Sequence, residues 1–578
     1  MKKIILISIF VLALFLRIYR LAVYPCGFNA DEAALGYNAY SLLKTGRDEF
    51  GHPWPINFQS FNDWKPGFYV YLTMPFIKVF GLNEWAVRLP SAILGGLTVI
   101  IVYLLVKKMF NDESCFFPAV AAFLLTISPW HLHFSRGAWE TNAATFFMTL
   151  GIFLFFLALK KPKYYFFSVL SFLLSMFTYH SARVVVPLLG LGIFIFYWKK
   201  IFIKENFHLL IPSFILGVFS LGVLFFSMNG QAGISRFSGV GIFADQGPFW
   251  RVNEMRGQHV NPYSLWSKIL HNKILEYSLQ FFDNYLRHFE GNFLFISGDE
   301  IQRNRVPEMG QMYLIEVPFL ILGIYFLLRK KPKNYPLVFW WLAVAPVASA
   351  MTFQSPHAIR ALNMVIPLVI IVSYGIVNCA IFLKSKFFAF SKIPDSNPKI
   401  QSSWFKVHCS WFKIHCSWFK VHSSLFKVLL SLLAILYFWN FSFYLHQYYV
   451  HYPQTYPYAW EAGFKDLAAY VKANESRFEK IYITNRYDQP YILMAFFTQY
   501  PPQNLQQEAT LTPRDQYGFS TVAHFGKYYF GPIDMERLTG EKNIMIVGAP
   551  KEIPDSATIV KRIYFMDGKT EAFRIVEP

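Results

Sequence analysis

Long apolar segments separated by short polar stretches dominate the pattern along the chain. The first begins directly after Lys2-Lys3 and ends near Leu21. Because roughly 20 apolar residues cross the hydrocarbon core of a bilayer, each segment of about this length is a candidate membrane helix. The pattern predicts about eleven such helices, namely the first segment and then 89–107, 116–134, 143–160, 164–181, 183–198, 208–228, 311–328, 335–352, 362–383 and 425–446.

Basic residues cluster at alternate ends of these segments. Lys and Arg are enriched in the cytoplasmic loops of membrane proteins. We therefore predict a multi-pass protein of the plasma membrane with a cytoplasmic N-terminus, in which the loops 22–88 and 229–310 and the tail 447–578 lie outside the cell. The clusters that fall on the same side as Lys2-Lys3 are Lys107-Lys108, Lys160-Lys161, Lys199-Lys200, Arg329-Lys330-Lys331 and Lys384 with Lys386.

The overall composition agrees with a polytopic membrane protein. Charged residues make up 15% of the 578 residues, whereas soluble domains contain roughly 25%. The net charge of +19 is explained by the predicted cytoplasmic loops, and nothing else in the sequence favours nucleic-acid binding. The five Cys residues are odd in number and scattered, so they indicate no disulfide framework.

The tail after the last apolar segment has a different pattern. Residues 460–473 show helical spacing, whereas 480–484, 543–547 and 559–565 alternate as strands do. The fold class predicted for the whole chain is therefore an all-α polytopic membrane protein with a small extracytoplasmic α/β domain at residues 447–578. The pattern contains no nucleotide-binding or metalloprotease motif, and it is typical of a docking or lid domain.

A linker at residues 385–424 precedes the last apolar segment and contains a repeat of seven residues. The unit Trp404 to Ser410 recurs at 411–417 and 418–424. Consecutive units on a helix would be about 10 Å apart, too far for their His and Cys side chains to share one metal ion. We interpret the repeat either as a basic aromatic helix on the cytoplasmic leaflet or as a duplication without a chemical role.

The first outer loop carries an acid pair, Asp31-Glu32, at the start of a helix-like stretch. One interpretation is structural, because carboxylates in a first helical turn favour the helix dipole. The other is catalytic, since a carboxylate at the membrane surface can act as the general base on an acceptor hydroxyl. The spacing alone leaves both open.

With the residues around it, this pair resembles a known family. The pattern is similar to the membrane-embedded glycosyltransferases of the GT-C fold, closest to the protein O-mannosyltransferase and aminoarabinose transferase type (glycosyltransferase families 39 and 83, with a PMT_2-type domain). The resemblance runs from about residue 10 to 365. Its motifs are Asp31-Glu32, Lys65-Pro66-Gly67, Glu84 to Ser91, Ser128-Pro129-Trp130, Phe134-Ser135-Arg136 with Glu140, Asn284 to His288, Gly298-Asp299, Gly310 to Tyr313 and Pro356 to Arg360.

The resemblance implies residue roles and a donor. It implies an inverting transfer of a sugar from a polyprenyl phosphate to an acceptor hydroxyl on the outer face of the membrane. It points to Asp31 as the general base, with Glu32 beside it and Glu140 at the second acidic position. Because phosphate recognition at an interface needs fixed cations, the donor phosphate is expected to meet Lys65, Arg136, His357 and Arg360.

Several alternatives remain at this stage. The acceptor can be a protein, a lipid or a polysaccharide, and the sugar is unspecified. Relatives differ in metal dependence, so no cofactor is assigned and a divalent metal stays open. The alternative function is a transporter or flippase of lipid-linked saccharides. Transporters tend to place ionisable groups at mid-membrane, whereas the predicted spans here are nearly free of charge, which favours the enzyme.

Overall fold

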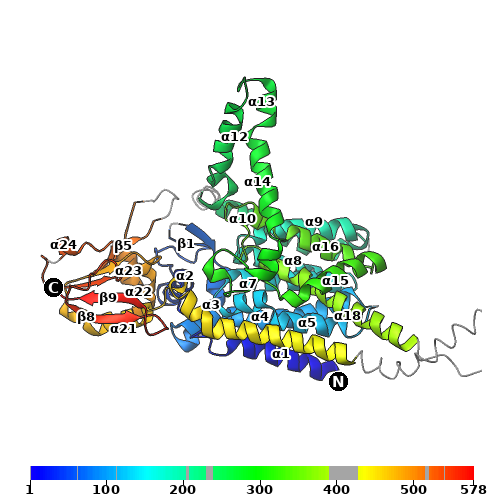
Figure 1. The fold of residues 1–578 in the computed structure, drawn as a ribbon, viewed down its shortest axis with the longest axis horizontal. Coiled ribbons are helices and arrows are strands. Elements are labelled where there is room, and N and C mark those ends of the chain that lie inside the picture. Colours follow the sequence, from blue (N-terminus) through cyan, green and yellow to red (C-terminus); the bar gives the residue numbers. More distant parts are fainter. Residues whose placement is uncertain are drawn as a thin grey trace, which may run out of the picture.

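A bundle of apolar helices forms most of the molecule, and a small sheet domain sits at one end of it (Figure 1). The computed structural model describes residues 2–61, 63–111, 113–203, 207–228, 239–389, 427–513, 520–538 and 540–578. The repeat at 404–424 lies outside these ranges. The helices of the bundle are α1 (Lys2–Ile18), α4 (Glu84–Met109), α5 (Phe117–Ile127), α6 (Pro129–Arg136), α7 (Glu140–Ala158), α8 (Tyr164–Thr178), α9 (Ala182–Ile201), α10 (Phe207–Met228), α15 (Val317–Lys330), α16 (Tyr335–Val344), α17 (Val347–Ala350), α18 (Val365–Ala389) and the helix Lys427–Thr455.

Each of the eleven predicted spans coincides with a helix or a helix pair, but the helices differ in length. Among the described residues, six are long and apolar enough to cross a membrane, or seven if the bent pair α5 and α6 is one span. Others are shorter, such as α8 with 15 residues and α15 with 14. Since 15 residues of helix rise only about 22 Å, the number of spans stays a prediction.

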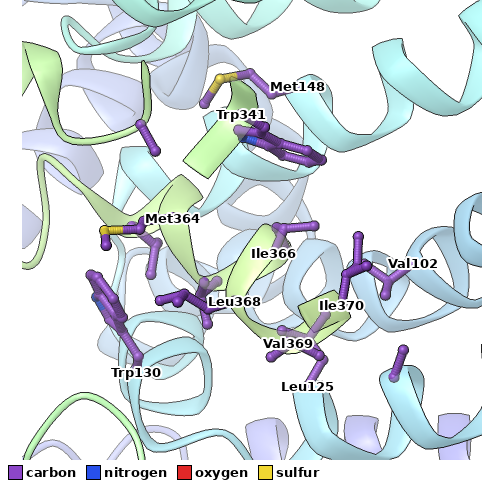
Figure 2. Packing of buried hydrophobic residues seen from close by; sticks show 14 of the residues in the cluster. Val102, Leu125, Trp130, Met148, Trp341, Met364, Ile366, Leu368, Val369 and Ile370 are labelled. Carbon is purple, nitrogen blue, oxygen red and sulfur yellow. The ribbon is translucent and has the colours of Figure 1, made fainter. Parts of the chain in front are cut away.

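The core of the bundle is built around α18. Figure 2 shows Trp130 of α6, Met148 of α7 and Trp341 of α16 packed around the first turns of α18, where Ile366 and Ile370 are fully buried. Both indole N–H groups form hydrogen bonds. Trp130 donates to the Ala358 carbonyl at 3.1 Å, and Trp341 donates to the Asn363 side chain at the same distance. Large apolar side chains, together with tryptophans whose N–H groups are hydrogen-bonded, fix the ends of these helices relative to one another.

Close backbone approach holds α15 against α18. A Cβ atom on Gly323 would lie 2.0 Å from the carbonyl oxygen of Ile371, and one on Gly375 would lie 2.1 Å from that of Phe319. Small residues at helix interfaces matter in a membrane because lipid tails are as apolar as Leu, so dispersion contacts between backbones drive association.

The bundle has chemically different ends. At one end, Glu84 at the start of α4 forms an ion pair with Lys465 of the sheet domain at 2.7 Å. At the other end of α4, a cavity of about 410 Å³ is lined by Lys108, Lys160, Lys200 and Lys333 among others. Basic residues from four loops therefore gather at this end of the bundle, as the charge pattern predicts.

The tail forms a mixed sheet of seven strands in the order β4-β5-β6-β3-β7-β9-β8, with β3 parallel to β6 and β7. Helix α21 begins at Phe464, later than the predicted start, because Glu461 and Gly463 adopt positive φ values of 51° and 99°. The elements are α21 (Phe464–Asn474), β3 (Lys480–Thr484), α22 (Pro490–Thr498), α23 (Pro502–Glu508), β4 (Thr510–Leu511), β5 (Val522–Phe525), β6 (Tyr528–Gly531), α24 (Met535–Leu538), β7 (Ile544–Gly548), β8 (Ile559–Tyr564) and β9 (Glu571–Val576).

The sheet domain is docked on the first outer loop rather than tethered beside it. That loop contains α2 (Ala30–Thr45), the strands β1 (Asn57–Ser60) and β2 (Asp63–Pro66), and α3 (Phe68–Phe80). Helix α22 packs along α2, and the rings of Phe28 and Phe496 lie 4.6 Å apart. The loop and the tail share one apolar core, so side chains of the two can form a common site.

A buried carboxyl at this contact makes the docking sensitive to pH. Glu49 accepts hydrogen bonds from Asn38 at 3.0 Å and from Tyr491 of α22 at 3.3 Å. Burial raises the pKa of Glu49 from 4.5 to about 8. The folded state therefore holds a proton that the unfolded state releases above pH 4.5.

We expect the free energy of unfolding to fall as pH rises between about 4.5 and 8, by up to about 1.4 kcal/mol per pH unit. The Glu49→Gln variant should show a shallower slope, reduced by the contribution of Glu49, because glutamine keeps the shape without ionising. Thermal unfolding midpoints in detergent across this pH range test the prediction. Glu479→Gln, at an exposed tail residue, should keep the wild-type slope. An unchanged slope in Glu49→Gln would contradict the assignment.

Candidate active site

The N-terminus of α2 presents Asp31 at the junction of the bundle and the sheet domain. Asn29 caps the helix, its side chain accepting a hydrogen bond from the Glu32 N–H at 3.1 Å. Asp31 is therefore not needed as the cap, and its side chain is 34% exposed. Its carboxylate forms an ion pair with Lys65 and lies 3.9 Å from a guanidinium nitrogen of Arg303. Two cations thus face one accessible carboxylate.

Lys65 reaches Asp31 from a short hairpin in the first outer loop. Strands β1 and β2 pair antiparallel, with Lys65 opposite Phe58. The Lys65 ammonium also lies over the ring of Phe61, 4.9 Å from its centre. The structure therefore brings together Asp31 and Lys65, two residues that the sequence assigned to different roles.

Arg303 was not predicted from the sequence. It belongs to a short 3-10 turn, Gln302–Asn304, in the loop before α15. Asp299 fixes this loop by accepting hydrogen bonds from the Ile301 N–H and the Asn304 side chain, both at 2.9 Å. Burial lowers the pKa of Arg303, but the carboxylates of Asp31 and the tail more than offset this, and the net shift is upward.

The sheet domain supplies two carboxyl groups to the same place. Glu461 accepts a hydrogen bond from the Ala30 N–H at 2.6 Å, so it contacts the first turn of α2 directly. Burial raises the pKa of Glu461 well above its usual value, Arg303 opposes this and Asp488 adds to it. The pKa of Asp488 is also raised, by burial and then by the nearby charge of Asp31. Both carboxyl groups are thus electrostatically coupled to Asp31.

A cavity of about 740 Å³ opens at this junction. Its walls come from the Arg303 loop, from the segment before α21 and from the residues that directly follow β3. The carboxyl edge of a parallel strand is where ligands bind in open α/β sheets. The lining residues are Glu300, Ile301, Gln302, Arg303, Tyr458, Ala459, Glu461, Asn485, Arg486, Tyr487, Asp488, Gln489, Pro490 and Thr521.

Glu32 points away from the cavity, although it is next to Asp31 in sequence. It is almost fully buried and holds Arg88 with both oxygens, at 2.8 and 2.7 Å. One of these oxygens also accepts the Ala138 N–H at 2.8 Å. The guanidinium of Arg88 donates further to the Leu21 carbonyl. This network ties α2 to α4 and leaves Glu32 without access to an acceptor.

Arg136 is likewise engaged in the interior. It is 1% exposed, and its guanidinium donates to the Tyr19 carbonyl at 2.8 Å and to the Tyr448 hydroxyl at 3.2 Å. It therefore holds the end of α1 against the helix Lys427–Thr455. The Arg136 side chain is enclosed by these partners in this structure, and its expected contact with a donor phosphate stays a prediction.

The remaining predicted residues contact neighbouring parts of the fold. His357 lies 3.7 Å from Asp299, which also accepts the Ala358 N–H at 2.6 Å. Arg360 donates to the Thr352 hydroxyl at 2.6 Å. These contacts connect the turn before α18 to the Arg303 loop. Glu140 is half-buried at the first position of α7, close to the contact of Glu32 with Ala138.

The described residues contain no group of three or more His, Cys, Asp or Glu side chains placed to hold a metal ion. The carboxyl groups near Asp31 are arranged around the cation of Arg303 instead. The site therefore offers cationic groups that can bind an anion and a carboxylate that can accept a proton.

Comparison with known proteins finds a matching family model and similar solved structures. Residues 65–226 match PMT_2, dolichyl-phosphate-mannose-protein mannosyltransferase. The structure of ArnT from Cupriavidus metallidurans in the apo state aligns over 99% of this chain and 97% of that one, with a TM-score of 0.52 and 12% identity. The predicted resemblance is confirmed. The chain has the GT-C fold of polytopic membrane proteins. The GT-C structure of ArnT bound to undecaprenyl phosphate aligns equally widely, with a TM-score of 0.51 and 14% identity.

Similarity to curated sequences is partial. An uncharacterized protein of Aquifex aeolicus (strain VF5) is 29% identical over 204 residues, which is 34% of this chain and 38% of that protein. The putative mannosyltransferase YkcB of Bacillus subtilis (strain 168) is 31% identical over 85 residues, 15% of this chain and 12% of its own length. The chain thus spans well under half the length of either relative.

Proposed function

We propose that the protein is an integral membrane glycosyltransferase that moves a sugar from a polyprenyl-phosphate-linked donor to an acceptor hydroxyl, with inversion at the anomeric carbon. The observation that carries the proposal is the accessible carboxylate of Asp31, faced by Lys65 and Arg303 beside a cavity of about 740 Å³. The match to PMT_2 and the ArnT-like fold support the reaction class. The undecaprenyl phosphate bound by ArnT supports the donor class.

In this mechanism Asp31 accepts the proton of the acceptor hydroxyl. The acceptor oxygen forms its bond to the anomeric carbon on the face opposite the phosphate, while the bond from that carbon to the phosphate oxygen breaks. Polyprenyl phosphate leaves with the electron pair of the broken bond. A single displacement of this kind inverts the anomeric configuration.

Lys65 and Arg303 stabilise the leaving phosphate. The Lys65 ammonium sits on a flexible four-carbon stem, so it can leave Asp31 for an incoming phosphate and free the carboxylate to act as a base. Arg303 can grip two phosphate oxygens at once. Cations placed in advance where negative charge develops lower the barrier without reorganisation during the reaction.

The cavity is suited to a hydroxyl-rich ligand. Asn485, Asp488 and Gln489 follow β3 and offer several donors and acceptors, while Tyr458 and Tyr487 provide aromatic faces. We assign the cavity to the polar part of the acceptor or to the donor sugar. We also propose that this end of the bundle is extracytoplasmic, since the basic clusters lie at the opposite end.

The proposal is tested with purified protein in nanodiscs that is offered a set of polyprenyl-phosphate sugars. Release of free polyprenyl phosphate and binding of each donor are measured together. Release, or tight binding of one donor that awaits an acceptor, is the expected result. If folded protein neither released polyprenyl phosphate nor bound any of the donors, the proposal would be contradicted. Passage of an intact donor across a sealed membrane would favour a transporter.

Arg303 gives a sharper test of the phosphate site. Arg303→Ala should lower kcat/KM for the donor by about 10- to 100-fold, because a charge-assisted hydrogen bond contributes about 1.5–3 kcal/mol. The donor KM should rise because the bound donor loses this contact, and kcat should fall because the leaving phosphate loses it too. Arg305→Ala is the matched control, since the Arg305 guanidinium lies over the ring of Tyr456 and is not among the groups that line the cavity. Equal effects of the two substitutions on donor KM would remove Arg303 from the phosphate site.

A further inference from the structure

A helical hairpin projects from the side of the bundle. It consists of α12 (Gly247–Gly257), α13 (Leu265–Leu270) and α14 (Lys273–Arg287). Figure 1 shows that it runs across the direction of α1, α4 and α5 rather than along it. If those helices cross a membrane, the hairpin lies parallel to the membrane plane.

The base of the hairpin is firmly attached to the end of the bundle that carries the candidate site. The Ile242 N–H donates to the Met351 carbonyl at 2.9 Å, and Asn284 donates to the Thr352 carbonyl at 3.0 Å. Thr352 also accepts from Arg360, which belongs to the turn beside the Arg303 loop. The hairpin therefore leaves the bundle near the level of the cavity.

The hairpin buries a charged side chain and exposes many large apolar ones. Glu276 of α14 is buried and forms an ion pair with Arg251 of α12 at 3.4 Å. By contrast, Ile274 is 82% exposed, two positions away on the same helix. Arg256 donates to the His271 carbonyl at 2.6 Å, which joins α12 to the start of α14. A hairpin built for water would show the reverse distribution.

The exposed apolar side chains gather along α14 and at the tip of the hairpin. Along α14, Leu275, Leu279, Phe282 and Leu286 are exposed at spacings of four, three and four residues, which places them on one helix face. At the tip, Tyr263 is 82% and Trp266 70% exposed, and Leu265, Ile269 and Leu270 are exposed with them. An exposed surface of this kind marks an interaction site.

We propose that this hairpin lies on the membrane, with its tip and the α14 stripe inserted at the boundary between headgroups and acyl chains of the leaflet nearest the candidate site. Continuity supports lipid as the occupant, because α10 at the base exposes Phe214 and Phe226 by more than 70% on a candidate span. Lys268 and Lys273 flank the tip, and basic residues beside aromatic ones are typical of interfacial helices. The hairpin thereby fixes the height of the cavity above the bilayer.

The proposal is independent of the enzymatic activity and is tested by photolabelling in nanodiscs. A lipid-soluble diazirine and a water-soluble one are applied separately, and labelled peptides are identified by mass spectrometry. Residues 263–286 should take up the lipid-soluble reagent as α10 does and be protected from the water-soluble one. Peptides of α24 in the sheet domain should show the opposite pattern.

A pair of neighbouring substitutions sharpens the result. Phe282→Ser should reduce lipid-phase labelling of α14, whereas Asp283→Ser, at an exposed residue paired with Arg287, should leave it unchanged. Labelling of the hairpin by the water-soluble reagent alone would overturn the proposal. Protection from both reagents would also overturn it, and would indicate that a second copy or another protein covers this surface.

Discussion

The Asp31→Asn variant is expected to lose sugar transfer by about 100-fold or more in kcat, which is the range for removal of a general base. Asparagine keeps the size of the side chain and can still accept a hydrogen bond from Lys65, but it cannot take a proton. The fold should remain intact, because Asn29 rather than Asp31 caps α2. Release of polyprenyl phosphate at saturating donor and acceptor measures the effect.

The split between kinetic parameters identifies the role of Asp31. A base acts in the transition state, so kcat should fall while donor binding changes little, in contrast to the KM effect expected for Arg303→Ala. Asp466→Asn, at an exposed position of α21, controls for the loss of one carboxylate. Wild-type turnover by Asp31→Asn would remove Asp31 as the base. A loss of activity that is accompanied by an equally clear loss of thermal stability would make the role of Asp31 structural.

The sequence predicts most of the architecture because its signals are local. Apolar runs locate the helices of the bundle, and alternation locates β3, β7 and β8 to within about one residue, inside the ±2–4 residues usual for such boundaries. Strands β5 and β6 are missed, since each has only four residues. Strand β9 is also missed, and its buried positions include a charged residue, Arg574.

The site is predicted less completely because its parts come from distant segments. Asp31 and Lys65 share one loop and carry a family pattern. Arg303 and Asp488 reach Asp31 only through the folded loop before α15 and the docked tail. A basic residue shortly after the predicted Gly298-Asp299 motif was the available signal for Arg303. Nothing local distinguishes Asp488 from other tail carboxylates.

Helical geometry explains why Asp31 and Glu32 lie in different surroundings. Neighbouring residues on a helix point about 100° apart, so the two side chains meet different partners. Asp31 turns toward Lys65 and Arg303, while Glu32 turns toward α4 and meets Arg88. Under the proposed function, the catalytic interpretation of the acid pair applies to Asp31 and the structural one to Glu32.

This division gives the second large prediction. Glu32→Gln should destabilise the protein by about 3–5 kcal/mol, because it leaves the guanidinium of Arg88 buried without a counter-charge. The midpoint of thermal unfolding in detergent measures the loss. Glu541→Gln breaks an exposed pair with Lys480 and should change the midpoint little, since such pairs contribute about 0–1 kcal/mol.

The double variant Glu32→Gln/Arg88→Met separates the ion pair from its surroundings. It should recover much of the lost stability, because a buried pair replaced by uncharged side chains of similar size leaves no unpaired charge. Restored stability with transfer retained would assign Glu32 to the frame that holds α2 against α4. A Glu32→Gln protein as stable as the wild type but inactive would instead return Glu32 to the catalytic group, and the acid pair would act together after all.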